Sequence, residues 1–238
     1  MRQVRIVPEL QPCPNGTCYL FWPDQIKGRL LPFEEMKLRT KFIDKEFKYD
    51  GTQLRSLYAY LDHGLLGDSI VSWIGPCDIS FDHMVDGEDL LAKAEIRGAR
   101  MVHFIVEKFQ TSLPEMVALQ RLLAAIVKDV IVTKDAKRDG EGRPPAIPRF
   151  ATHREGDDVF VMLPDGAGKL SISIATVSPS SGLLHFAVNV TNEGTPVKTA
   201  SLEDFRFAAR EFAEIVLGEF SRECASIREA TMKVKWVR

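Results

Sequence analysis

The chain has 238 residues, of which 45% are hydrophobic and 27% charged, the composition of an ordinary globular protein with one large domain, or one domain and an appendage. Its formal net charge of −2 gives no electrostatic reason to expect nucleic acid as a partner. No apolar run approaches the roughly 20 residues that span a bilayer, and residues 1–16 lack the apolar centre of a signal peptide, so we expect a cytoplasmic protein without a membrane partner.

The first 45 residues are rich in proline and have no sustained hydrophobic periodicity. We expect an N-terminal extension over residues 1–45, with a short strand at residues 3–7 and a helical turn near residues 32–39, followed by the main domain over residues 46–238. Cys13 and Cys18 resemble half of a metal site, but no second Cys/His pair has a suitable spacing. We therefore predict no metal site.

The next part of the chain predicts a helix, two strands and a longer helix. Residues 52–64 favour a helix, and residues 69–75 and 100–109 are compact apolar strands. The long helix should begin at Ser112, because Ser112 and Glu115 form a capping box, and should continue to about Thr133. Charged, glycine and proline residues follow, so residues 134–149 indicate a mobile loop. The apolar positions at helical spacing are Met116, Leu119, Leu122, Leu123, Ile126 and Val130.

Lys169 opens a segment that otherwise has the pattern of a buried strand. Its apolar positions are Leu170, Ile172 and Ile174, and its polar or small positions are Lys169, Ser171, Ser173 and Ala175. Residues 183–190 repeat this alternation, with His185 and Asn189 on the polar side. If the apolar faces coincide in a hairpin, paired residues have numbers with an even sum, which places Ser171 near Asn189 and Ala175 near His185.

The polar face of this hairpin carries one lysine, two serines, a histidine and an asparagine separated by small residues. Such a face suits the floor of a small-molecule pocket with a few fixed polar groups. The alternative is a solvated outer face of an antiparallel sheet, which needs no ligand. Both interpretations stay open at this point. We treat Ser171, Ser173, His185 and Asn189 as candidate substrate contacts.

The C-terminal part predicts a second long helix and a last strand. The helix should begin near Ser201, with residues 201–204 as its cap, and residues 231–238 should form the strand. The helix should bury Phe205, Ala208, Phe212, Ile215 and Val216. Strands without regular βαβ alternation indicate an α/β or α+β fold, with a mixed, largely antiparallel sheet and helices packed on it.

Five stretches stand out together: YDGTQLRS (49–56), GDSIVSWIGPCD (67–78), MVDGEDL (84–90), MVHFIVEKF (101–109) and KLSISIATVSPSSGLLHFAVNV (169–190). In this combination they resemble a microbial family known as domain of unknown function 366. The resemblance covers residues 49–238 and implies no particular reaction.

Two stretches, REGDDVFVMLPDGAGKLSISIA (154–175) and LLHFAVNV (183–190), carry a second resemblance. They are similar to the parts of lipoate and biotin protein ligases that hold an Asn-Asp pair, the active-site lysine and a later Asn-Val strand. The resemblance matches Lys169 to that lysine, which contacts the acyl carboxylate and the α-phosphate. It also matches Asp157 or Asp158 to the acidic residue, and Asn189 to the asparagine. It implies the fold of the ligase catalytic domain, a small carboxylate substrate, acyl-adenylate formation with ATP and Mg²⁺, and an acceptor protein.

The ligases also carry an Arg-Arg-x-x-Gly-Gly-Gly loop around the nucleotide, which this sequence does not repeat. The nearest stretch, residues 96–104, offers Arg97 and Arg100 as nucleotide contacts. His103 lies in the same stretch and shares a strand face with Glu107, so it is a candidate for acid–base catalysis.

Further polar residues allow more than one interpretation. Arg55 and Asp68 border apolar segments, where they would contact a substrate or each other. The acidic residues at 86, 88 and 89 favour a helix start over a divalent-ion site. The leading hypothesis is an enzyme that activates a small carboxylate. A non-catalytic small-molecule binder, and an ATP-independent enzyme that acts on a nucleotide or heterocyclic acid, are the alternatives.

Overall fold

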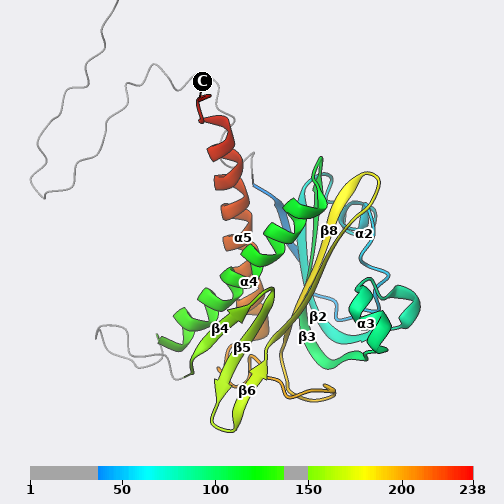
Figure 1. Cartoon of the computed structure of the whole chain (residues 1–238), viewed down its shortest axis with the longest axis vertical. Helices are drawn as coiled ribbons and strands as arrows, with labels where there is room; N and C mark the ends of the chain where they lie inside the picture. The colour runs from blue at the N-terminus through cyan, green and yellow to red at the C-terminus, as the bar shows by residue number, and fades with distance from the viewer. Residues whose placement is uncertain (1–36, 137–149, 238) are drawn as a thin grey trace, which may run out of the picture.

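The computed structural model describes residues 37–136 and 150–237 (Figure 1). The strands are β1 (Arg39–Phe42), β2 (Ser69–Ile79), β3 (Ile96–Phe109), β4 (Thr152–Glu155), β5 (Asp158–Leu163), β6 (Gly166–Lys169), β7 (Ser171–Val177) and β8 (Ser181–Asn189). The helices are α2 (Tyr58–His63), the 3-10 helix η2 (Phe81–His83), α3 (Gly87–Ala92), α4 (Leu113–Ala136) and α5 (Ala209–Met232).

The strands form a large and a small sheet. The five-stranded sheet has the order β1-β2-β3-β8-β7, and the three-stranded sheet has the order β4-β5-β6. Only the β1–β2 pair is parallel among these strand pairs of the described residues. The predicted fold class, a mixed and largely antiparallel sheet with helices packed on it, is therefore confirmed.

The large sheet is buried on both faces. Helices α4 and α5 cover one face, where Ile70, Phe104 and Phe186 join the main hydrophobic core. Trp73 and Ile105 belong to a second apolar cluster on the other face, which also includes residues of α2. Figure 1 shows α4 and α5 on one side of the sheet and α2 and α3 on the other. Cover on two faces explains why β8 and the central parts of β2 and β3 are buried at successive positions.

The predicted central elements are confirmed. Strands β2 and β3 contain the residues expected to be strands, and β7 and β8 form an antiparallel hairpin. Helix α4 begins at Leu113, and the backbone N–H of Glu115 donates to Ser112 Oγ at 3.4 Å, as the capping box predicts. Within the described residues no helix has both the length and the apolar character that crossing a membrane requires.

The predicted register of the β7–β8 hairpin is wrong. Ser171 pairs with Val188 rather than Asn189, and Ala175 pairs with Leu184 rather than His185. The cause lies at Leu170, where the chain leaves the small sheet after Lys169 and enters the large sheet at Ser171. Leu170 therefore packs in the main core, whereas Ile172 packs against the cluster on the opposite face. Leu170 and Ile172 therefore lie on different faces, although the sequence pattern placed them on one.

The predicted elements at both ends also need correction. Helix α5 begins at Ala209, because residues 201–204 form a turn in which Asp204 Oδ2 accepts from the backbone N–H of Ser201 at 2.8 Å. Ala208 and Ile215 are consequently not buried. The last residues form no strand in the described part, since α5 continues to Met232 and residues 233–237 are irregular and exposed. The expected helix over residues 52–64 shortens to α2.

Strand β1 pairs with β2, so residues 39–42 of the predicted N-terminal extension belong to the large sheet. The predicted strand at residues 3–7, Cys13, Cys18, and residues 137–149 of the predicted loop lie outside the described residues. The same is true of most of the helical turn expected near residues 32–39.

We expect Gly75→Ala to destabilise the protein by about 1–3 kcal/mol, because a Cβ at Gly75 would lie 1.9 Å from the backbone oxygen of Phe47. The matched control is Gly218→Ala inside α5, where an added Cβ would have no atom of the other described residues within 4 Å. Alanine is the better helix former, so the control should gain about 0.5–1 kcal/mol. Urea unfolding of the two variants measures both effects, and equal stability of the pair would contradict the close approach at Gly75.

Candidate functional site

A cavity of about 510 Å³ lies on the face of the large sheet opposite α4 and α5, and Lys169 borders it. Its volume is in the range of small-molecule sites. Strand residues from β3, β7 and β8, the end of β6, the segment around α3, and the loop at residues 195–199 surround it. The apolar lining includes Tyr49, Leu54, Met101, Ile172 and Ile174, and the polar lining includes Asp89, Arg97, Asp157, Asp158, Lys169, His185 and Asn189.

Lys169 is the last residue of β6, and its backbone is fixed on two sides. It pairs with Phe160 of β5, and its N–H donates to Lys198 O at 3.1 Å. Its Nζ lies 2.8 Å from Asp158 Oδ2, and both side chains are about one third exposed, at 32% and 29%. The ammonium group is therefore held at the cavity by a carboxylate of the neighbouring strand and stays accessible to a ligand.

Asn189 lies at the end of β8 and connects three segments. Its Nδ2 donates to Lys169 O and to Ala200 O, each at 3.1 Å. The backbone N–H of Asn189 donates to Leu170 O at 3.0 Å. Asn189 thus borders the cavity as a structural link that sets the position of Lys169, and its Oδ1 has no hydrogen-bond partner among the described residues.

Asp157, Ser171 and Ser173 border the cavity, but their polar atoms bind one another and neighbouring elements. Asp157 accepts from Ser173 Oγ at 2.6 Å, from Gln120 Nε2 at 2.8 Å and from Arg121 at 2.5 Å. Ser171 Oγ accepts from the backbone N–H of Val159 at 3.0 Å. These contacts tie α4 and β5 to β7. The expectation that both serines share one polar face with His185 and Asn189 is wrong, because the register differs.

Carboxylates outnumber cations around the cavity. Asp86 caps α3 by accepting from the N–H groups of Glu88 and Asp89, as expected for a helix start. Burial, followed by the nearby Asp86, raises the pKa of Asp89, and the charge of Lys169 acts in the opposite direction. Arg97 pairs with Asp78 at 3.3 Å. Among the described residues no group of three or more His, Cys, Asp or Glu side chains is arranged to hold a metal ion.

Two buried histidines lie beneath the cavity and form a directed chain of hydrogen bonds. His103 Nε2 lies 3.1 Å from Gly75 O, and a carbonyl oxygen can only accept, so this nitrogen carries the hydrogen. In a neutral ring Nδ1 of His103 is then an acceptor. It lies 3.1 Å from His185 Nε2, which must donate. The remaining nitrogen of His185, which borders the cavity, is therefore an acceptor.

Burial keeps this chain uncharged. It lowers the pKa of His103 to about 4 and the pKa of His185 well below its usual value. Tyr49 stacks on His185 with ring centroids 3.6 Å apart, and burial raises the pKa of its hydroxyl. Cys77 nearby is buried and its pKa is raised to about 12, so it is a thiol rather than a nucleophilic thiolate at neutral pH. The floor of the cavity is thus aromatic and neutral.

Four candidate residues do not border the cavity. His103 lies behind His185, and Arg100 pairs with Glu46 at 2.8 Å. Arg55 binds both oxygens of Asp62, at 2.9 and 2.8 Å. Asp68 binds Lys108 at 3.2 Å and the backbone N–H of Phe109 at 2.8 Å. Arg55 and Asp68 therefore do not contact each other.

Glu107 and His103 have separate hydrogen-bond partners. Its buried carboxylate accepts from the backbone N–H of Leu57 at 2.8 and 3.1 Å and from Ser181 Oγ at 2.7 Å. These contacts hold Leu57, which has a left-handed φ of 63°, at the start of α2.

Tyr49 and Asp89 are not marked as site residues by any local sequence pattern. Tyr49 comes from an irregular segment and reaches the sheet through a single bridge with Cys77. Asp89 belongs to a short helix whose acidic residues are explained by helix capping alone. Only the folded arrangement brings the two residues to the same cavity.

The model of the family Domain of unknown function (DUF366) matches residues 38–235. The chain belongs to this family. Uncharacterized protein MJ0805 of Methanocaldococcus jannaschii is 28% identical over 169 residues, which are 68% of each chain. The structure of a protein of unknown function from Pyrococcus horikoshi is 35% identical and superposes with a TM-score of 0.74, covering 84% of this chain and 100% of that chain.

Structural neighbours of this DUF366 member also include biotin and lipoate protein ligases. A biotin protein ligase from Aquifex aeolicus in complex with biotin and ATP has 13% identity and a TM-score of 0.49, over 80% of this chain and 72% of that chain. A bipartite lipoate protein ligase from Thermoplasma acidophilum has 14% identity and a TM-score of 0.44, over 80% and 84%. Similarities this weak carry no conclusion about the reaction.

We expect stability to fall as the pH is lowered from about 6.5 toward 4. In this window the unfolded chain protonates His103 and the folded chain does not, so the unfolded state binds more protons. His103 alone should remove ~2 kcal/mol between about pH 7.5 and 5. Urea unfolding at the two pH values measures the loss. His103→Gln should lessen it, His153→Gln at an exposed site should not, and a flat wild-type profile would refute a neutral buried pair.

Proposed function

We propose that this DUF366 member binds a small molecule with an apolar body and one carboxylate in the Lys169 cavity. The observation that carries this proposal is the meeting of Lys169, Asn189 and His185 at one cavity with an aromatic and aliphatic floor. The apolar body would lie on Tyr49 and Ile172, and the carboxylate would accept from Lys169 Nζ, which is accessible at the rim.

The ion pair with Asp158 determines how Lys169 could bind an acid. A ligand carboxylate would share or displace Asp158 Oδ2, which lies 2.8 Å from the ammonium group. Partial burial strengthens such a charge-assisted hydrogen bond relative to one in water. The acceptor nitrogen of His185 would favour a ligand that also carries an N–H or O–H donor on its apolar side.

The cavity lining fits a triphosphate poorly. Among the described residues, Lys169 and Arg97 are the cations that border it, and each is paired with a carboxylate. The carboxylates that border it are those of Asp86, Glu88, Asp89, Glu95, Asp157 and Asp158. A nucleotide would meet this negative charge unless a divalent ion screened it. Binding without turnover is therefore the better supported function, and ATP-dependent activation of the acid, with transfer to an acceptor protein, is the second candidate.

We expect Lys169→Ala to weaken binding of the preferred acid by at least about tenfold, because it removes a charge-assisted hydrogen bond. Thermal shift and calorimetric titration with lipoate, octanoate, biotin and heterocyclic acids identify that acid. The matched control is Lys108→Ala, whose ammonium group is similarly half-buried and paired with Asp68 at 3.2 Å outside the cavity. The control should bind normally.

Asp158→Asn sharpens this test. It keeps the shape of the side chain and removes the charge that competes for Lys169, so it should strengthen binding of the acid. No stabilisation by any acid, or equal losses in the variants at Lys169 and Lys108, would refute the binding proposal. ATP–pyrophosphate exchange with Mg²⁺ then separates the candidates, since exchange that Lys169→Ala abolishes would favour the activating enzyme over the binder.

A further inference from the structure

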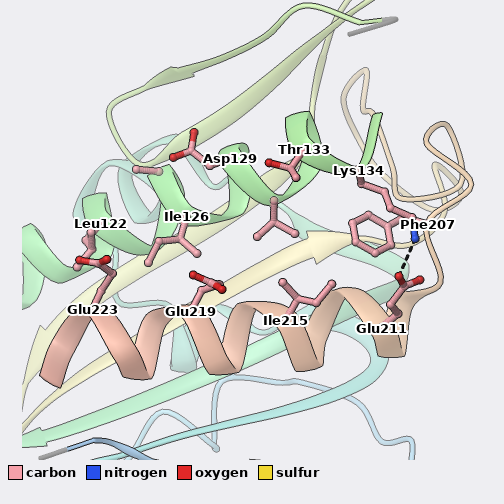
Figure 2. A pocket seen from close by; sticks show the side chains of 12 residues that line it. Leu122, Ile126, Asp129, Thr133, Lys134, Phe207, Glu211, Ile215, Glu219 and Glu223 are labelled. Carbon is pink, nitrogen blue, oxygen red and sulfur yellow. Dashed lines mark hydrogen bonds and ion pairs between the residues drawn. The ribbon is translucent and has the colours of Figure 1, made fainter. Parts of the chain in front are cut away.

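The hollow between α4 and α5, of about 730 Å³, has no buried polar side chain among the described residues that line it. Its buried lining residues, Ile126 and Phe207, are apolar. Its charged side chains are exposed or only partly buried, and Figure 2 shows Lys134 and Glu211 joined in an ion pair, at 2.6 Å. Apolar surface of this kind does not identify an occupant. The Lys169 cavity differs, because buried polar atoms border it.

The unpartnered polar atoms in the deep part of the Lys169 cavity are hydrogen-bond acceptors. His185 is 1% exposed, and its Nδ1 is the ring nitrogen that remains an acceptor when Nε2 donates to His103. Asn189 is 4% exposed, and its Oδ1 has no partner among the described residues. Neither atom belongs to the fully enclosed polar atoms without a partner, so each can be reached from the cavity. Because a buried acceptor without a donor is costly, these atoms favour a ligand that donates hydrogen bonds.

Asp89 of α3 adds an unpaired carboxylate at the rim. It is partly buried, and its carboxylate forms neither a hydrogen bond nor an ion pair within residues 37–136 and 150–237. Burial is the main cause that raises the pKa of Asp89, and the charges of Lys169 and Asp158 also act on it, so these three side chains lie within electrostatic range of one another. Asp158 is already paired with Lys169 at 2.8 Å. A cationic group of a ligand would therefore supply the partner that Asp89 lacks.

We propose that the ligand of the Lys169 cavity is an α-amino acid with an aromatic side chain, and this inference rests on the proposed function. The carboxylate of the amino acid would accept from Lys169 Nζ, and its ammonium group would donate to the carboxylate of Asp89. The aromatic side chain would lie on Tyr49 and Ile172, with an N–H or O–H group directed at His185 Nδ1.

An α-amino acid carries both of its charges at one end, which matches the distribution of charge in the cavity. Lys169 and Asp89 both lie at the rim. Burial lowers the pKa of the two histidines beneath the cavity, so the floor is uncharged. An ammonium group at the far end of a side chain would lose its hydration over this floor without a counter-charge. A carboxylic acid without an ammonium group would leave Asp89 unpaired.

Calorimetric titration of the full chain with matched pairs of ligands tests the proposal. The pairs are phenylalanine with phenylpropionate, tyrosine with hydroxyphenylpropionate, and tryptophan with indolepropionate. We expect each amino acid to bind at least about tenfold more tightly than its deaminated acid, because the ammonium group adds a charge-assisted hydrogen bond. Tyrosine and tryptophan should bind more tightly than phenylalanine, which has no side-chain donor for His185. Tryptamine, which lacks the carboxylate, should bind more weakly than tryptophan.

Variants at Asp89 separate its charge from its role in α3. Asp89→Asn should bring each amino acid down to about the affinity of its deaminated acid, whereas Asp89→Glu keeps a carboxylate and should keep the preference. The matched control is Asp82→Asn, which makes the same change of charge at an exposed residue of η2 outside the cavity, and it should also keep the preference. Circular dichroism checks that each variant is folded.

The titrations distinguish a failure of this inference from a failure of the proposed function. Deaminated acids that bind as tightly as their amino acids, or a preference that survives in Asp89→Asn, would overturn the inference and leave the binding of acids at Lys169 intact. Equal binding of phenylalanine and tyrosine would overturn the contact with His185. If neither the amino acids nor the acids bind, or if Lys169→Ala and Lys108→Ala lose binding equally, the proposed function itself fails.

Discussion

One side-chain amide joins the two sheets where the candidate site lies. Asn189 extends from the central strand β8 and donates to Lys169 O and Ala200 O, each at 3.1 Å. It is only 4% exposed, so losing its side-chain amide would remove the donor to Ala200 O and would leave Lys169 O with the backbone N–H of Ala200 alone. The position of Lys169 therefore depends on β8 of the large sheet as well as on its pairing with β5 in the small sheet.

The crossing at Leu170 also shows where sequence patterns succeed and fail. Strands β2 and β3 could be predicted because burial on both faces gives them compact apolar segments, and β8 could be predicted from its alternation of residues. The alternation of apolar residues from Leu170 to Ile174 indicated one strand face. The chain passes from the small sheet to the large sheet after Lys169, so Leu170 and Ile172 do not lie on the same face. The hydrophobic pattern indicates which positions are buried but not which element buries them. The register of the hairpin therefore could not be derived from the pattern.

Site residues could be predicted where the nearby sequence indicates their role. They could not be predicted where a contact between distant segments determines it. Lys169, His185 and Asn189 were identified by their polar positions in otherwise apolar segments, and the resemblance also pointed to Lys169 and Asn189. Arg55 looked like a substrate contact because it is polar beside an apolar segment, yet a partner seven residues later, Asp62, accounts for it. Tyr49 begins a stretch that carries the family resemblance, but nothing near it in the sequence marks it as a site residue, since its stacking on His185 joins residues from distant parts of the chain.

The cavity has an uncharged floor and a charged rim. Its floor holds the neutral chain from Gly75 through His103 to His185, whose burial disfavours protonation. Its rim holds the Lys169–Asp158 pair and the acidic start of α3. A ligand with one charged end is stabilised only when that end stays at the rim, because a charge over the neutral floor would lose its hydration without a counter-charge. If a small acid binds here as proposed, this arrangement of charge would determine its orientation.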